Sequence, residues 1–166
     1  MKQNGDVSGF RFQDTRFMTI YIGSDHAGFK LKQAIKEYLI KSGFAIKDLG
    51  NHNLSPLDDY PDYAEKVARA VQKSSDQRGI LFCGSGEGVC IVANKFKGIR
   101  AVVGFSRYAA KQSRADDDAN ILCLPARVLT TNEVKRIVEA WLKEKFSGEA
   151  RHIRRLKKIK IIETKY

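Results

Sequence analysis

Short apolar runs alternate with longer amphipathic stretches along most of this chain, and this alternation limits the possible folds more than any other feature. The runs are rich in Ile, Val, Leu and aromatic residues, and they are largely apolar at consecutive positions. Such continuity is typical of strands that are covered on both faces. The pattern predicts five strands, at residues 19–22, 45–49, 79–83, 100–103 and 121–124.

Three of the stretches that follow these runs have apolar residues at the spacing of an α-helix. These stripes are Leu31, Ala34, Ile35, Tyr38 and Leu39; Tyr60, Ala64, Val67, Ala68 and Val71; and Val134, Ile137, Val138, Trp141 and Leu142. Thr130 and Glu133 have the spacing of a capping box before the last stripe. Repeated strand–helix units predict right-handed crossovers and a parallel sheet between helices. We therefore expect a Rossmann-like α/β/α sandwich with a five-stranded parallel sheet and a basic C-terminal helix.

The composition is that of one globular domain. The chain has 166 residues, of which 43% are hydrophobic and 30% charged, and its formal net charge is +11. Nine Phe and six Tyr, with many aliphatic residues, can supply a core, which excludes a disordered or collagen-like chain. Residues 1–17 have no sustained period and contain two glycines, so we expect a flexible N-terminal extension before a single domain at residues 18–166.

The cysteines favour a reducing compartment. Cys83, Cys90 and Cys123 are odd in number and lack the spacing of zinc ligands. A disulfide framework and a structural metal site are therefore not expected, and a cytoplasmic location is. Residues 1–17 lack the apolar core of a signal peptide, and no apolar run has the length of a membrane span. We expect no membrane partner.

Because ligands of open α/β sheets bind beyond the carboxyl ends of the strands, the loops that follow the strands are the first place to look for a site. Asp25 and His26 follow the first predicted strand. An acceptor beside a proton shuttle could bind a polar ligand. Alternatively, Asp25 caps the next helix by accepting from its amides, which is the more common role of an aspartate at such a position.

A glycine-rich loop follows the third strand. Gly84, Gly86 and Gly88 fall within five residues and lead into a helix, so backbone N–H groups could converge there on an anion. No Gly-Lys-Ser/Thr follows, and the spacing is one residue short of G-x-G-x-x-G. The loop therefore predicts a small oxyanion as ligand, not a nucleotide.

Cys83 stands at the beginning of this loop. A thiol beside a helix N-terminus and free amides can become a thiolate, able to act as a base or a nucleophile. The alternative is a small buried hydrophobic residue at the end of a strand, and the residue types alone do not decide between the two. Cys90 and Cys123 are assigned to the second class.

The C-terminal stretch is strongly basic. Residues 143–166 contain nine Lys or Arg against three Glu. In a helix, Arg151 and Arg155 would lie one turn apart on the same face, which suits a phosphate dianion. A solvated basic helix is the simpler interpretation. A nucleic-acid partner is disfavoured, because aromatic residues do not alternate with the basic ones and no RNP, KH or helix-turn-helix pattern is present.

Taken together, these motifs resemble the ribose-5-phosphate isomerase B / galactose-6-phosphate isomerase family from about residue 18 to residue 163. The matching pieces are Gly23-Ser24-Asp25-His26-Ala27-Gly28-Phe29, Asp59-Tyr60-Pro61, Cys83-Gly84-Ser85-Gly86-x-Gly88, Ala93-Asn94-Lys95, Gly98-Ile99-Arg100-Ala101 and Arg151-His152-x-x-Arg155. The resemblance implies an aldose–ketose isomerase of a phosphorylated sugar that needs no metal or organic cofactor. It also implies a homodimer or tetramer in which neighbouring subunits share each site.

Residue roles follow from the resemblance. Cys83 would take the C2 proton and return it at C1 through a cis-enediol(ate), while Ser85 and the loop amides stabilise the developing oxyanion. The implied substrate contacts are Asp25, His26, Tyr60, Gly84, Gly86, Glu87, Gly88, Asp117, Arg127, Arg151 and Arg155. Among these, Arg127, Arg151 and Arg155 would hold the phosphate. Glu87 would be a surface residue of the loop and not the base.

Asp116-Asp117 departs from the family pattern, which usually has His-Asn there to open the sugar ring. Asp116 could serve as the acid or base if repulsion along the aspartate run raised its pKa. Alternatively, His26 opens the ring or the open-chain sugar is bound directly.

The leading expectation is interconversion of ribose 5-phosphate and ribulose 5-phosphate in the pentose phosphate pathway. The alternatives are a hexose 6-phosphate isomerase, for allose or galactose 6-phosphate, and a catalytically silent protein that binds sugar phosphate or RNA.

Overall fold

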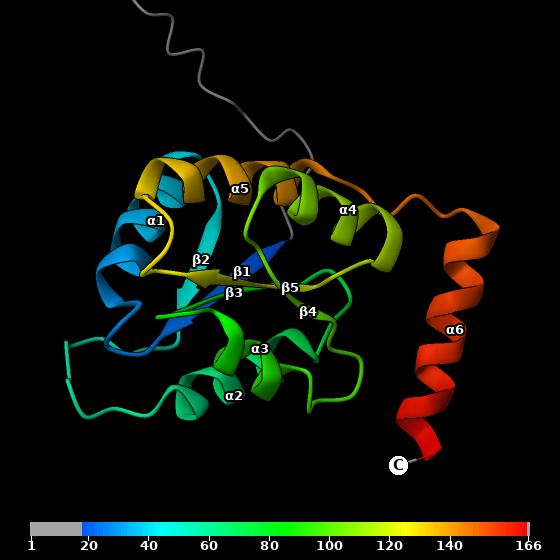
Figure 1. The fold of residues 1–166 in the computed structure, drawn as a ribbon, viewed down its shortest axis with the longest axis horizontal. Coiled ribbons are helices and arrows are strands. Elements are labelled where there is room, and N and C mark those ends of the chain that lie inside the picture. The colour runs from blue at the N-terminus through cyan, green and yellow to red at the C-terminus, as the bar shows by residue number, and fades with distance from the viewer. Residues whose placement is uncertain (1–17, 166) are drawn as a thin grey trace, which may run out of the picture.

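The computed structural model describes residues 18–165, so the predicted extension at residues 1–17 lies outside the described part of the chain. Strands and helices alternate up to β5, and two helices follow it (Figure 1). In chain order the elements are β1 (Thr19–Ser24), α1 (Phe29–Lys41), β2 (Ala45–Asp48), α2 (Tyr60–Val71), β3 (Arg78–Cys83), α3 (Glu87–Ala93), β4 (Ala101–Val103), α4 (Arg107–Asp117), β5 (Ile121–Pro125), α5 (Thr131–Lys143) and α6 (Ala150–Lys165).

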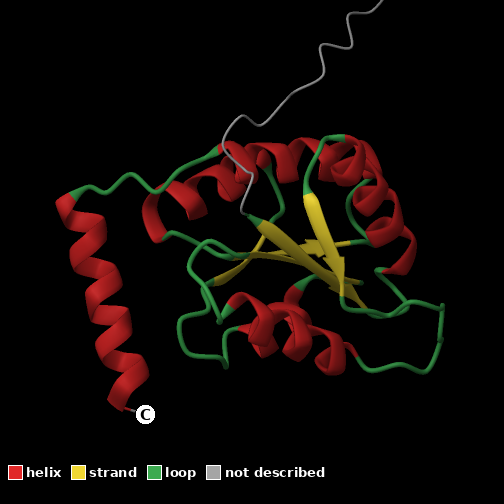
Figure 2. Ribbon diagram, turned by 180° about the vertical axis from the view of Figure 1, so that it is seen from behind, coloured by secondary structure: helices red, strands yellow, loops and turns green. Residues whose placement is uncertain are grey.

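The sheet confirms the predicted architecture. Its strand order is β2-β1-β3-β5-β4, and every pair is parallel. Helices α1, α4 and α5 cover one face and α2 and α3 cover the other, so the protein is a Rossmann-like three-layer sandwich (Figures 1 and 2). β3 lies at the centre of the sheet between β1 and β5.

The strand residues divide between two cores because successive side chains point to opposite faces. Ile80 and Phe82 pack under α1 and α5, whereas Leu81 and Cys83 face α2 and α3. Each predicted helical stripe contributes buried residues to one of these cores, as the amphipathic pattern requires. The predicted capping box of α5 is present, with Thr130 accepting from the Glu133 amide.

β2 differs from the prediction of strands covered on both faces. Its four residues alternate between exposed and half-buried positions. It is an edge strand that pairs only with β1, so its outer side is not covered by a neighbour. β1, in contrast, is longer than predicted, because Gly23 and Ser24 continue the pairing with β3.

α6 stands beside the sandwich and covers neither face of the sheet (Figures 1 and 2). Its first turn is attached to α4 through His152, whose Nε2 lies 3.7 Å from Asp116 Oδ1, and the linker before it through Ser147, whose N–H donates to the Ala115 carbonyl at 3.0 Å. Its far end is attached by the Gly98 N–H, which donates to Glu163 Oε1 at 3.1 Å. The helix exposes four isoleucines, Ile153, Ile159, Ile161 and Ile162. Within residues 18–165, every helix falls short of the length and apolar character needed to cross a membrane.

Candidate active site

Cys83 is the last residue of the central strand and lies at the carboxyl edge of the sheet. Its side chain is 4% exposed and faces the α2–α3 layer. The Gly86 N–H donates to its Sγ at 3.0 Å. Gly86 has φ 80°, in the left-handed region that favours glycine, and this turn directs the amide back toward the sulfur. A thiolate at this position would face the positive end of a backbone dipole.

Two side chains from other elements cover the glycine loop. A Cβ on Gly84 would lie 2.9 Å from the guanidinium carbon of Arg127, and a Cβ on Gly88 would lie 2.7 Å from the Tyr60 ring. Arg127 follows β5 and Tyr60 begins α2, so the fold brings both to the loop after β3. The glycines are needed there because any larger residue would displace these groups.

The polar pair after β1 is held by hydrogen bonds. Asp25, 7% exposed, accepts from the Gly28 N–H at 2.9 Å. Gly28 is itself the N-cap of α1, which has no side-chain cap hydrogen bond, so Asp25 closes the turn before the helix and does not cap it. Both the backbone N–H and Nδ1 of His26 lie within 3 Å of Asp58 Oδ1, at 2.9 and 2.8 Å. Asp58 Oδ2 accepts in turn from Asn51 Nδ2 at 2.6 Å. The His26 side chain remains 37% exposed, so its ring is fixed but accessible.

Ion pairs and hydrogen bonds connect α1, β2 and the segment after β2 at this edge of the sheet. Burial raises the pKa of Asp58, but hydrogen bonds from His26 and Tyr63 outweigh burial and hold that pKa below its usual range. The fully buried Lys32 Nζ contacts Asp48 Oδ1 at 2.8 Å and donates to the Asn51 carbonyl at 2.5 Å. Asp48, Asn51 and Asp58 were not predicted from the sequence, because the 48–58 segment has no period that assigns its polar residues to one face.

Ser85 and Glu87 lie on the exposed side of the loop. Ser85 Oγ accepts from the Glu87 N–H at 3.4 Å, and Glu87 occupies the first turn of α3. Because the first amides of a helix have no intrahelical acceptor, the N–H groups of Gly88 and Val89 are also available at this end. The predicted oxyanion donors and the thiol therefore lie in one loop.

Four other predicted site residues lie at the opposite, amino edge. Asp116 and Asp117 end α4, and the chain then enters the sheet where Asn120 accepts from the Gly79 N–H at the start of β3. Arg151 and Arg155 lie in α6, beside the end of α4; α6 is helical, as predicted, and both arginines are exposed. One chain therefore does not bring these four residues to Cys83.

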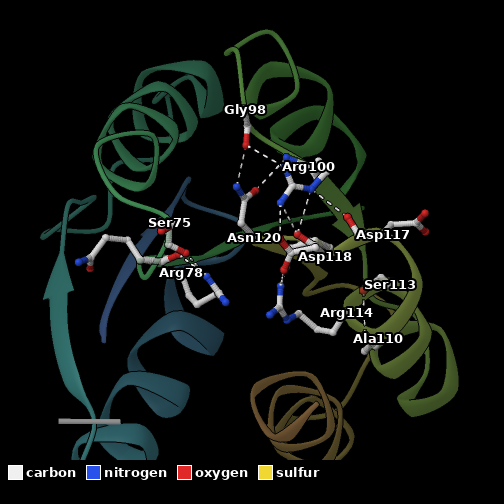
Figure 3. Close-up of polar contacts among 12 residues, drawn as sticks. Ser75, Arg78, Gly98, Arg100, Ala110, Ser113, Arg114, Asp117, Asp118 and Asn120 are labelled. Atoms are coloured by element: carbon white, nitrogen blue, oxygen red, sulfur yellow. Dashed lines mark hydrogen bonds and ion pairs between the residues drawn. The ribbon is translucent and has the colours of Figure 1, made fainter. Parts of the chain in front are cut away.

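The three aspartates of the run have different surroundings. Asp116 Oδ1 lies 3.7 Å from Nε2 of the buried His152, while Asp117 is exposed and points away from its neighbours (Figure 3). Asp118 accepts from Arg100 and Arg114. Their carboxylates face different partners, which gives no support to repulsion along the run as the source of an acid. Within residues 18–165 no three His, Cys, Asp or Glu gather as a metal site.

The other two cysteines differ from each other. Cys123 is fully buried, and burial raises the pKa of its thiol well above the usual value, as expected for a core residue. Cys90 is only partly buried; a hydrogen bond from Cys123 lowers the pKa of its thiol, and its Sγ lies 3.3 Å from the Ala101 carbonyl oxygen. All three cysteines are free thiols.

Comparison with known proteins shows which protein family this chain resembles. The model of the family described as Ribose/Galactose Isomerase matches residues 20–159. The probable ribose-5-phosphate isomerase B of Mycoplasma genitalium is 47% identical over 141 residues, covering 84% of this chain and 92% of that protein. The ribose-5-phosphate isomerase B of Escherichia coli is 44% identical over 144 residues, covering 87% and 95%.

A solved structure agrees in fold. The crystal structure of ribose-5-phosphate isomerase B from Mycoplasma genitalium with bound ribulose-5-phosphate has a TM-score of 0.87 and 44% identity, and covers 90% of this chain and 99% of that chain. The family match includes β1 from its second residue and the other four strands in full, and so both edges of the sheet. These agreements in sequence and fold show that this chain belongs to the ribose/galactose isomerase family.

Proposed function

We propose that this protein is an aldose–ketose isomerase that interconverts ribose 5-phosphate and ribulose 5-phosphate, with Cys83 as the base. The observation that carries the proposal is the position of the thiol, at the end of the central strand and in hydrogen-bond contact with its own glycine loop. Relatives named ribose-5-phosphate isomerase B support the choice of substrate. The three free thiols fit the expected cytoplasmic location.

The chemistry needs a base and an oxyanion site in one place. The Cys83 thiolate removes the proton from C2 of the open-chain aldose, the C–H electron pair forms the C1=C2 bond, and O1 becomes negative. Transfer of the O2 proton to O1, and return of the first proton from Cys83 to C1 as the C2=O2 bond forms, leave the ketose. Amides of the glycine loop and the Ser85 hydroxyl stabilise the enediolate, because donors fixed in advance need no reorganisation.

The phosphate clamp requires a second copy of the chain. Arg127 covers the loop of its own chain, but Arg151 and Arg155 lie at the amino edge. A homodimer in which the amino edge of one subunit meets the carboxyl edge of the other brings these guanidinium groups to one site. The exposed isoleucines of α6 supply apolar surface for such a contact.

Ring opening is assigned to one of two groups. Asp116, with 39% of its side chain exposed, would reach the neighbouring subunit's site in this dimer. His26 is already at the carboxyl edge, and its Nδ1 is occupied by Asp58, which leaves Nε2 to face a ligand. If the histidine that the family usually has is the better ring-opening group, Asp116→His will increase turnover of ribose 5-phosphate, whereas His26→Asn will decrease turnover if His26 does this work.

The first experiment is turnover of both pentose phosphates by the purified protein and by Cys83→Ala. Removing a general base should lower kcat by about a thousandfold while sugar-phosphate binding persists. Cys90→Ala is the matched control, since Cys90 lies in α3 outside the loop, and it should retain activity. Retained turnover in Cys83→Ala would show that another group is the base. No turnover by the wild type, with salt-sensitive RNA binding, would favour the silent binding protein.

The shared site is tested by mixing two inactive variants. Cys83→Ala and Arg155→Gln damage different edges, so a mixed dimer has one site with both defects and one site with neither. Random exchange of subunits should restore about a quarter of the wild-type activity. If the mixture stays inactive although mixed dimers form, each site belongs to one chain.

A substrate panel separates the pentose proposal from the hexose alternative. The hexose alternative rests on Asp116, which has a carboxylate where the family usually has a histidine. Ribose, allose and galactose phosphates should be compared by kcat/KM on the same preparation. Equal or better turnover of a hexose phosphate would replace the pentose assignment and leave the role of Cys83 unchanged.

A further inference from the structure

A polar pocket lies at the amino edge of the sheet, away from the thiol. Its volume is about 230 Å³, and it lies between the loop before β3 and the segment that leads into β4. The residues that give it its chemistry are Ser74, Ser75, Arg78, Lys97, Arg100 and Asn120. Figure 3 shows the guanidinium groups of Arg78, Arg100 and Arg114 arranged around Asn120 and Asp118.

Arg78 is the half-buried cation of this pocket. One of its terminal nitrogens, Nη1, donates to the carbonyl oxygens of Ser75 and Gln77, both at 2.9 Å. Across residues 18–165, neither Nε nor Nη2 has a hydrogen-bond acceptor and no carboxylate forms an ion pair with the group. Burial and the neighbouring charges of Arg114 and Arg100 lower the pKa of Arg78 to about 10, although Asp118 and Asp76 act in the opposite direction.

The carboxylate that lines the pocket, Asp118, is already paired with two other arginines. Asp118 Oδ2 pairs with Arg100 at 2.8 Å, and Asp118 Oδ1 pairs with Arg114 at 2.7 Å. Each oxygen therefore has a cationic partner. Lys97 adds an exposed ammonium group at the rim. The pocket and its walls thus contain more positive than negative charge, and two donors of Arg78 remain for an added anion.

The pocket is formed in advance, because Asn120 holds the segment before β4. Its Oδ1 accepts from the Arg100 N–H at 2.8 Å, and its Nδ2 donates to the Gly98 carbonyl at 2.8 Å. Arg100 is also fixed, by donating to the backbone carbonyls of Asp117 and Asp118. A ligand would find these groups in place and would not have to order them.

We propose that this pocket binds a phosphate dianion, either inorganic phosphate or the terminal group of a small phosphomonoester. A guanidinium with two free donors matches the oxygens of phosphate, and a nearby ammonium adds a second charge. The volume admits a phosphate with a few attached atoms. The exposed side chain of Asp117 points away from the arginines (Figure 3). None of the amino-edge residues that the isomerase proposal uses, Asp116, Asp117, Arg151 and Arg155, lines the pocket.

The test observes Arg78 directly. In full-length protein labelled with ¹⁵N-arginine, the Arg78 Nε–Hε signal is assigned by its loss in Arg78→Gln. Inorganic phosphate, added at constant ionic strength, should shift this signal saturably. Lys97→Gln should raise the half-saturating concentration about tenfold, because it removes one charge from the pocket. Arg136→Gln, on the exposed side of α5 at the other face of the sheet, removes a charge elsewhere and should leave the titration unchanged.

Two further titrations distinguish free phosphate from a phosphomonoester, and this pocket from the isomerase site. Glycerol 3-phosphate in place of phosphate tells whether a phosphomonoester binds more tightly than the free ion. Repeating the titration in Arg155→Gln, which damages the proposed isomerase site, should give the same shift. A shift that disappears in Arg155→Gln would assign the binding to the isomerase site, and a signal that does not saturate would exclude the pocket. Neither result depends on whether the protein isomerises pentose phosphates.

Discussion

In the loops at the carboxyl edge of the sheet, backbone and side chains approach so closely that glycines are required, whereas in the loop before β4, at the amino edge, long charged side chains surround a pocket. Gly28, Gly84 and Gly88 each face an atom less than 3 Å from where a Cβ would lie. Gly98, at the other edge, has open space at that position. The position of the Cys83 thiol therefore depends on the shape of the backbone at the carboxyl edge. The proposed binding of an anion at the amino edge depends instead on side-chain charge.

The largest effect is expected from adding a methyl group at the carboxyl edge. In Gly28→Ala, the Cβ would lie 2.5 Å from the Phe82 backbone, which cannot move without disturbing the central strand. We expect a loss of at least about 4 kcal/mol in the free energy of unfolding, or no folded protein. Urea unfolding followed by circular dichroism measures this change.

Gly98→Ala is the matched variant at the amino edge. Its φ of 78° opposes a side chain, but no atom lies within 4 Å of the new Cβ. The expected loss is about 1 kcal/mol, the cost of a left-handed alanine alone. Equal losses in the two variants would mean that close approach does not distinguish the edges.

The second effect concerns the buried ion pair beneath the carboxyl edge. Asp48→Asn leaves the Lys32 ammonium, whose side chain is fully buried, without its carboxylate. Breaking a buried pair from one side should cost about 3 kcal/mol in unfolding free energy at pH 7. Lys36→Met, which removes the more exposed partner of Asp48, should cost less than Asp48→Asn does. The reverse order would show that Lys32 does not depend on this carboxylate.

The same pair predicts how stability varies with pH. Burial raises the pKa of Asp48, but hydrogen bonds from Lys32, Lys36 and the Gly50 amide hold that pKa below its ordinary 3.8. The stabilisation is therefore complete above pH 3.8 and is lost as the pH falls through the lower, folded-state pKa. Asp48→Asn should flatten the acid limb of the stability profile, and an unchanged limb would assign acid sensitivity to other carboxylates.

A second small effect, similar in size to that of Gly98→Ala, is expected at the amino edge. Asp118→Asn keeps a residue type that accepts the φ of 46° found there, while it removes the charge that pairs with Arg100 and Arg114. The side chain is 33% exposed, so we expect a loss of about 1 kcal/mol in unfolding free energy. Phosphate should recover part of that loss in Asp118→Asn but none in the double variant with Arg78→Gln.

Much of the sandwich could be predicted from the sequence because burial leaves a periodic trace. The apolar stripes of α1, α2 and α5 and the apolar runs of β1, β3 and β5 each mark a buried face. The sequence of α4 has no apolar stripe, because two of its three buried residues, Ser113 and Arg114, are polar and the third is Ala110. We expected β2 to be buried on both faces, but its residues alternate between exposed and half-buried positions. It is an edge strand with a neighbouring strand on one side only.

The candidate site was only partly accessible from the sequence. The groups of the carboxyl edge follow their strands directly, so the rule for parallel sheets places Asp25, His26 and Cys83 at the same edge. Asp58 could not be assigned, because its contact with His26 spans 32 residues without a spacing that marks it. Nor can spacing tell whether Asp116 and Arg155 serve their own chain or a neighbour, since that depends on an interface between chains.

The unequal attachment of β3 and α6 has a consequence for heat inactivation. The amides of β3 are shielded by a strand on each side and should exchange with deuterium only when the whole domain opens. Within one chain, α6 is attached to the domain mainly near its two ends, so in a subunit that has separated from its partner it can detach at a much smaller cost. Warming should therefore release the arginine-bearing helix first, and enzymatic activity should vanish while the sheet that carries the thiol is still intact.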